Sequence, residues 1–164
     1  MSANKDQPHV LVLPEDDANR QLAFGFYLQI DLNRQRRMQI LRPAQGWIKV
    51  ADEFVSVHVR EMRACPLRFM VLLLDFDSDI ERLERVRARV PADLTERVFI
   101  IGALSDPEAL RQAIHRSPEK IGSALAQDCR EDTDTIWGHE LLRHNASELD
   151  RLRRDVRPIL FPSN

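Results

Sequence analysis

The sequence has few of the residues that mark specialised classes of protein. Its two cysteines, Cys65 and Cys129, stand too far apart for a zinc site or a disulfide framework, so we expect reduced thiols in a cytoplasmic protein. Residues 1–8 lack the apolar core of a signal peptide, and the longest apolar stretch is too short to span a bilayer, so no membrane association is expected. The net charge of −2 creates no overall basic field that would attract nucleic acid.

What remains is the composition of one soluble globular domain. Hydrophobic residues make up 43% of the chain and charged residues 30%, which is ordinary for such domains. A chain of 164 residues is long enough to bury a substantial core. We therefore expect residues 1–164 to form a single domain, without repeats or linkers.

Short apolar runs alternate with helical patterns along the chain. Strands are expected at 9–13, 36–41, 69–74 and 97–102, where the runs are nearly continuous, as in strands that are buried on both faces. Helices are expected at 15–30, 47–62, 80–90, from 106, 117–129 and 137–152. The alternation of residues 54–59 fits a strand equally well. This order predicts an α/β, Rossmann-like fold, with a mainly parallel sheet of about four strands, flanking helices and a helical C-terminal tail over about 117–164.

Acidic residues follow two of the predicted strands. Glu15 comes after the first strand, and Asp75, Asp77 and Asp79 follow the run 69–74. Ligands collect at the carboxyl ends of parallel strands, and carboxylates gathered there repel one another unless a cation lies among them. A hard divalent ion, Mg²⁺ or Mn²⁺, is the natural neutraliser. Side chains two residues apart in an extended segment point the same way, so Asp75 and Asp77 are expected to share one ion.

The segments 11–15 and 72–77, an apolar strand ending in glutamate and a later one ending in Asp-x-Asp, resemble the two acidic motifs of the Toprim domain. That domain occurs in topoisomerases, primases and the overcoming-lysogenisation-defect class of nucleases. The resemblance covers about residues 8–115 and implies a metal-dependent nuclease that cuts phosphodiesters of nucleic acid. It implies catalytic and metal-binding roles for Glu15, Asp75 and Asp77, with Asp79 as a further metal ligand and Asp16, Asp17 and Glu108 as additional acids.

The chain departs from the Toprim pattern at two positions. Asp16 stands where the family usually has glycine, and Asn19 stands where small Toprim nucleases often carry a second acid. The sequence has no ATPase motif, so the domain would act alone or beside a separately encoded ATPase subunit, as the resemblance to bacterial defence systems implies. The segment 117–164 carries no motif that we can assign.

Basic residues gather between the first predicted helix and the second predicted strand. Binding of substrate phosphates is one interpretation of this cluster, and a solvated or partner-facing surface is the other. The cluster consists of Arg34, Arg36, Arg37 and Arg42.

Two other functions stay open on the sequence alone. Asp-x-Asp after an apolar strand is also the nucleophile motif of haloacid-dehalogenase-like phosphatases, but that family places it near the start of the chain and follows it with Thr or Val rather than Ser78. The second open function is a non-catalytic interaction or regulatory domain with a degenerate acidic site. A receiver-like domain, one version of it, needs a lysine directly after a strand, which Lys5, Lys49 and Lys120 do not supply.

Overall fold

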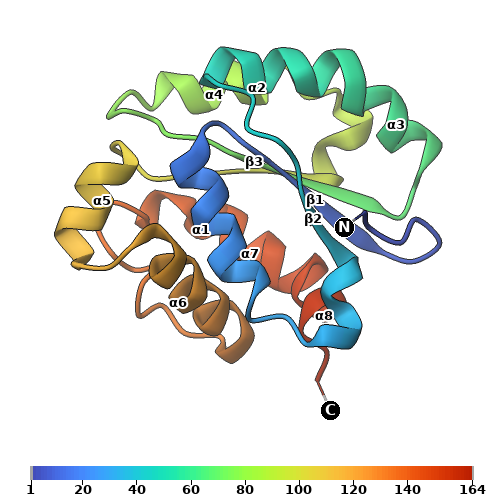
Figure 1. The fold of residues 1–164 in the computed structure, drawn as a ribbon. Coiled ribbons are helices and arrows are strands. Elements are labelled where there is room, and N and C mark those ends of the chain that lie inside the picture. The colour runs from blue at the N-terminus through green and yellow to red at the C-terminus, as the bar shows by residue number, and fades with distance from the viewer. Residues whose placement is uncertain (1, 164) are drawn as a thin grey trace.

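The parallel sheet predicted from the sequence is the centre of the fold. The computed structural model describes residues 2–163 and contains, within them, a four-stranded sheet in the order β2-β1-β3-β4 with all strands parallel (Figure 1). The expected α/β class is therefore confirmed. The strands are β1 His9–Pro14, β2 Met38–Ile40, β3 Arg68–Leu73 and β4 Val98–Ile101.

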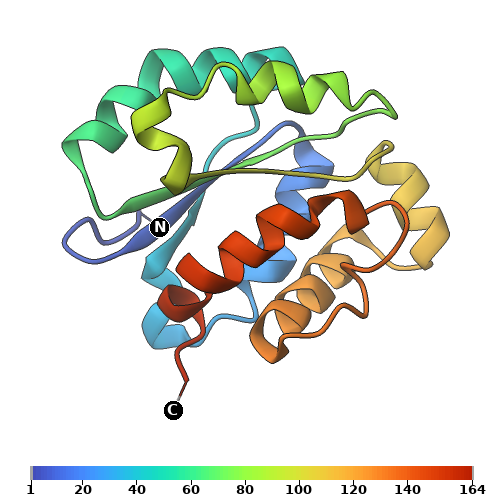
Figure 2. The same cartoon turned by 180° about the vertical axis from the view of Figure 1, so that it is seen from behind.

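Helices cover both faces of the sheet (Figures 1 and 2). The connection from β1 to β2 runs one way along the sheet and the later connections run the other way, so right-handed crossovers place their helices on opposite faces. One face carries α2 Trp47–Glu53, the π-helical segment η2 Phe54–His58, α3 Val59–Ala64 and α4 Glu81–Arg87. The other carries α1 Asp17–Tyr27, α6 Pro118–Glu131, α7 Ala146–Asp155 and α8 Arg157–Leu160.

Shorter elements complete the connections. The ambiguous segment 54–59 is helical and continues α2 into α3. The helix α5 Pro107–Ile114 follows β4 at the end of the sheet. Within residues 2–163 no helix has the length and apolar character to cross a membrane. Three 3-10 turns are η1 Leu32–Arg37, η3 Ala92–Arg97 and η4 Arg143–Asn145.

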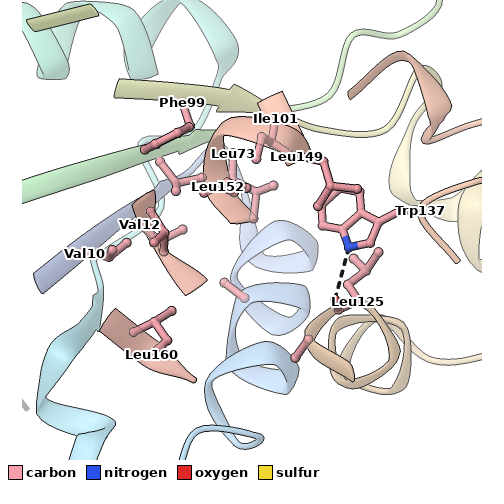
Figure 3. Packing of buried hydrophobic residues seen from close by; sticks show 14 of the residues in the cluster. Val10, Val12, Leu73, Phe99, Ile101, Leu125, Trp137, Leu149, Leu152 and Leu160 are labelled. Atoms are coloured by element: carbon pink, nitrogen blue, oxygen red, sulfur yellow. Dashed lines mark hydrogen bonds between the residues drawn. The ribbon is translucent and has the colours of Figure 1, made fainter. Parts of the chain in front are cut away.

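β1, β3 and β4 are continuous apolar runs because each contributes to two cores. Val10 and Val12 of β1 face α1, α6 and α7, whereas Leu11 and Leu13 face the helices on the other side. Figure 3 shows the first of these cores, in which the Trp137 indole N–H donates to the Leu125 carbonyl at 3.1 Å. The tail that contains Trp137 is therefore part of the core.

Two glycines let the tail pack directly on the first helix. A Cβ on Gly122 of α6 would lie 1.9 Å from the Leu22 carbonyl oxygen, and one on Gly25 of α1 would lie 1.9 Å from the Glu119 carbonyl oxygen. Both distances are far below van der Waals contact, so any larger residue would push the helices apart. The α1–α6 contact therefore requires glycine at both crossing positions.

The tail departs from the sequence prediction between Trp137 and Asn145. A helix was expected over 137–152, but the chain makes turns until α7 begins at Ala146. The buried Asp128 carboxylate accepts hydrogen bonds from the backbone N–H groups of Ile136, at 2.6 Å, and Trp137, at 3.2 Å. These bonds hold residues 136 and 137 against α6, and the isolated turns that follow do not join into an α-helix before Ala146.

Side chains of the tail cover the outer edge of β4. The Glu148 carboxylate accepts from the Ile100 N–H at 2.9 Å, and the Asn145 side chain both accepts from the Gly102 N–H at 3.2 Å and donates to the Gly102 carbonyl at 2.9 Å. Arg151 pairs with Glu148 at 2.8 Å and donates to the Val98 carbonyl at 3.3 Å. These bonds satisfy the backbone groups that a fifth strand would otherwise pair.

Replacement of Glu148 by alanine is expected to lower the free energy of unfolding by about 1–3 kcal/mol, since the Ile100 N–H and Arg151 lose a buried acceptor. Chemical denaturation measures this change. Glu148→Gln keeps an acceptor and should lose less, and Glu140→Ala, at an exposed position of the same tail, should change stability by less than about 0.5 kcal/mol. Equal losses for all three variants would contradict the role given to Glu148.

Candidate acidic site at the carboxyl ends of β1 and β3

The strand order places a topological switch point at the carboxyl ends of the two central strands. β1 and β3 are neighbours in the sheet. From β1 the chain continues to β2 on one side, and from β3 it continues to β4 on the other side, so it leaves the two strands in opposite directions. Such a switch point in an open parallel sheet leaves a crevice outside the carboxyl ends of the strands, where ligands bind. Glu15 directly follows β1, and Asp75 lies two residues beyond the end of β3.

Glu15 and Asp75 meet at this switch point. The Glu15 carboxylate accepts a hydrogen bond from the Asp75 backbone N–H at 2.8 Å, and the Glu15 N–H donates to the Leu73 carbonyl at 2.8 Å. Burial raises the pKa of Glu15, and the hydrogen bond from Asp75 opposes that shift. The structure therefore brings together one acid from each of the two predicted motifs.

The Asp75 carboxyl is buried, with 6% of the residue exposed. Its Oδ2 accepts from the Asn19 side-chain amide at 3.2 Å, whereas its Oδ1 is buried without a hydrogen-bond partner among residues 2–163. Burial, followed by the nearby charges of Asp16 and Glu15, raises the pKa of Asp75 to about 8. Because the Asn19 amide only partly opposes these effects, the site favours a neutral Asp75 or an added cation.

An apolar cavity of about 90 Å³ lies beneath Asp75, between the sheet and the helices of the tail. Asn19 and Asp75 contribute its polar lining, and most of the other lining residues are apolar, including Leu73, Leu110 and Trp137. Water is a poor match for such a space because it finds few hydrogen-bond partners there. The cavity explains why the Asp75 carboxyl is so strongly desolvated.

Asn19 and Asp16 organise the other side of the Asp75 carboxyl. Asp16 caps α1 by accepting from the Asn19 backbone N–H at 2.9 Å, and it also accepts from the Asn19 side-chain amide at 3.1 Å. The same amide donates to Asp75. An amide at position 19 therefore donates to two neighbouring carboxyls, where an acid would add a third negative charge.

Asp77 does not lie on the same side as Asp75, contrary to expectation. Asp77 and Ser78 adopt left-handed backbone conformations with φ of 48° and 58°, so the chain is not extended there. The Asp77 side chain is 63% exposed and its Oδ2 lies 3.3 Å from Arg82 Nη2. Within residues 2–163, no three His, Cys, Asp or Glu side chains are already grouped to hold a metal ion.

The remaining predicted acids lie outside the Glu15–Asp75 contact. Asp79 accepts from the Glu81 N–H at 3.0 Å at the start of α4. Asp17 is exposed and pairs with Arg20 at 2.8 Å, which lowers the Asp17 pKa. Glu108 is exposed on α5 and pairs with Arg111, which likewise lowers its pKa.

Asp106 is the acid near Asp75 that the sequence prediction missed. It caps α5 by accepting from the Ala109 N–H at 2.8 Å. Its negative charge is one of the causes that raise the pKa of Asp75. The sequence signal for Asp106 was its position before Pro107, which marks a helix start after β4. That signal indicated a cap, and only the strand order shows that this cap lies beside β3.

The predicted basic cluster is divided between the amino ends and the carboxyl ends of the strands. Arg34, Arg36 and Arg37 lie in η1, before β2, and so at the amino ends of the strands, away from the acids. Arg34 donates to the Ile159 carbonyl at 2.8 Å and Arg37 to the Pro8 carbonyl at 3.3 Å. Arg42 follows β2 and so lies at the carboxyl ends of the strands, where the acids are.

The donor set at the switch point suits a hard divalent cation. Glu15, Asp16 and Asp75 offer carboxylate oxygens, the ligands that Mg²⁺ and Mn²⁺ prefer. The buried Asp75 Oδ1, which has no partner within residues 2–163, is a free acceptor of the kind that an ion occupies. The residues present therefore offer the oxygen ligands that such an ion prefers, but within residues 2–163 no three of these acidic side chains are grouped around one point, so an ion would need to draw them together.

Comparisons with known proteins gave no match to a family model, a curated protein or a solved structure.

The buried Asp75 carboxyl should make stability fall as the pH rises. The folded state favours the protonated form, so its stabilisation is full below about pH 4 and is lost as the pH rises through about 8. Asp75→Asn in EDTA should therefore raise Tm at pH 8 by about 4–8 °C, which corresponds to ~2 kcal/mol, and by much less at pH 4.5.

Thermal unfolding across this pH range measures the difference. Asp77→Asn is the matched control, because it changes an exposed carboxylate two residues away and should show no comparable growth of the Tm difference with pH. A difference for Asp75→Asn that does not depend on pH would contradict the burial argument.

Proposed function

We propose that the protein is a cytoplasmic, metal-dependent nuclease or nuclease-like subunit that acts on phosphodiesters of nucleic acid, alone or beside an ATPase subunit. One observation carries this proposal: acids from two separate strands, Glu15 and Asp75, converge at the switch point of a parallel sheet, and a buried carboxylate oxygen there is free to bind a cation. The ordered motifs that resemble those of Toprim domains support the same proposal.

Each residue has a role that follows from its position. Asp75 and Glu15 would hold a divalent ion from the two central strands, and Asp77 would join them from the exposed loop. When bound, such an ion lowers the pKa of a coordinated water and neutralises charge on the phosphate. In the alternative in which Glu15 does not bind the ion, the raised pKa of its half-buried carboxyl suits a general base that takes a proton from the attacking water.

The phosphatase alternative has less support. It requires Asp77 to act as an acid beside a phosphorylated Asp75, but Asp77 is turned toward Arg82 and Asp75 toward the interior. A shared metal ion requires the same rearrangement of the Asp77 loop, and the nuclease is preferred because the phosphatase motif normally lies near the start of the chain and is followed by Thr or Val rather than Ser78. A non-catalytic domain that keeps the acids without a bound ion is the outcome to exclude by experiment.

Isothermal titration with MnCl₂ is expected to show binding at pH 8, and incubation of plasmid or single-stranded nucleic acid with Mg²⁺ or Mn²⁺ should give cleavage that EDTA abolishes. Asp75→Asn and Asp77→Ala should each reduce the cleavage rate by about 100-fold or more, since each removes a proposed metal ligand.

Asp17→Asn is the matched control, because Asp17 is an exposed acid on α1 that pairs with Arg20 outside the site. This variant should cleave like the unaltered protein. Absence of Mn²⁺ binding, or cleavage that survives in Asp77→Ala, would refute the proposed site, and trapping of a phosphate on Asp75 would favour the phosphatase instead.

A further inference from the structure

Arg82 is a cation held between the two acidic residues of the β3 motif. It lies in the first turn of α4, and its side chain is 20% exposed. Its Nη1 donates to the backbone carbonyl of Asp75 at 3.2 Å, and its Nη2 lies 3.3 Å from Asp77 Oδ2. The guanidinium therefore spans the loop that would carry the metal ligands.

Trp47 fixes the same guanidinium from another element. The Arg82 Cζ lies 5.3 Å from the centroid of the Trp47 ring, within the range of a cation–π contact. Trp47 begins α2, directly after the loop 42–46, where the N–H groups of Ala44 and Gln45 donate to the carbonyls of Pro14 and Glu15 at 3.0 and 2.7 Å. Arg82 is thus held beside the end of β1 as well as β3.

The contact with Asp77 is the most solvent-exposed of the three attachments. Asp77 is exposed, lies in a left-handed loop and meets Arg82 at 3.3 Å, long for a charge-assisted hydrogen bond. A divalent ion that took Asp77 as a ligand would repel Arg82 Nη2. The Asp75 carbonyl and Trp47 would still hold the guanidinium beside the site, with Nη2 free to donate.

We propose that Arg82 is the phosphate-binding residue of the acidic site, and that it neutralises Asp77 until a divalent ion and the substrate phosphate replace that contact. This inference rests on the proposed nuclease function. It names the anionic phosphodiester as the group that Arg82 recognises, since Nη2 can donate a charge-assisted hydrogen bond to a phosphate oxygen while Nη1 stays on the Asp75 carbonyl. Arg82 therefore competes with the metal ion for Asp77, and both Arg82 and the metal ion then bind the substrate phosphate.

The two roles predict opposite effects of one substitution. Arg82→Gln removes a competing cation, so the Kd for Mn²⁺ in isothermal titration should decrease about 3- to 10-fold. The same variant should bind fluorescein-labelled single-stranded DNA or RNA about 10-fold or more weakly, in anisotropy titrations with Ca²⁺ in place of Mn²⁺ to slow cleavage.

Two further variants separate charge from geometry. Arg82→Lys keeps the charge but not the planar fork, so Mn²⁺ affinity should stay near that of the unaltered protein while oligonucleotide affinity falls. Arg85→Gln is the matched control, because Arg85 lies on the same helix, is 60% exposed and pairs with Glu81 at 3.1 Å. It removes the same charge and should change neither affinity more than about 2-fold.

The outcomes distinguish this inference from the function on which it depends. If the unaltered protein binds Mn²⁺ and cleaves nucleic acid, but Arg82→Gln weakens both affinities or leaves oligonucleotide binding unchanged, Arg82 is a structural residue and the inference is wrong. If the unaltered protein binds no Mn²⁺, the proposed function fails and the inference fails with it. Circular dichroism and Tm of each variant verify that it is folded.

Discussion

The hydrogen bond from the Asp75 N–H to the Glu15 carboxylate joins the ends of the two central strands, and the candidate site depends on it. β1 and β3 are paired as far as Pro14 and Leu73, and beyond this point their chains leave the sheet in opposite directions. The bond holds Glu15 beside Asp75 rather than in solvent. Both acids are thereby kept at the switch point that the strand order creates.

This arrangement opposes folding and is retained nevertheless. A buried carboxyl above an apolar cavity, beside two further acids, is unfavourable when ionised, and this is why the pKa of Asp75 is raised to about 8. Natural proteins keep unfavourable groups of this kind mainly where function requires them. The Asn19 amide and the Arg82 guanidinium relieve part of the repulsion without removing either acid from the site.

The C-terminal tail supports the site although it contributes none of the predicted acids. Asn145 and Glu148 complete the outer edge of β4, and the Leu104 N–H donates to the Leu141 carbonyl at 2.9 Å. The backbone beyond β4 in turn binds the acidic loop, since the Phe76 N–H donates to the Ala103 carbonyl at 3.1 Å. A chain of backbone contacts thus runs from the tail to the residue between Asp75 and Asp77.

The sequence alone determined the α/β class, the strands that carry Glu15 and Asp75, and the chemistry of their side chains, because apolar runs and acids after them are local patterns. It did not determine that Asp75 turns inward while Asp77 turns toward Arg82, because that follows from left-handed backbone at Asp77 and Ser78 and from bonds to β4. The burial of Asp75 and the approach of Asp106 were decided by strand order, whereas Arg34, Arg36 and Arg37 are separated from the acids because they precede β2 in a parallel sheet. Strand order brings together or separates residues far apart in the chain, and no local pattern encodes it.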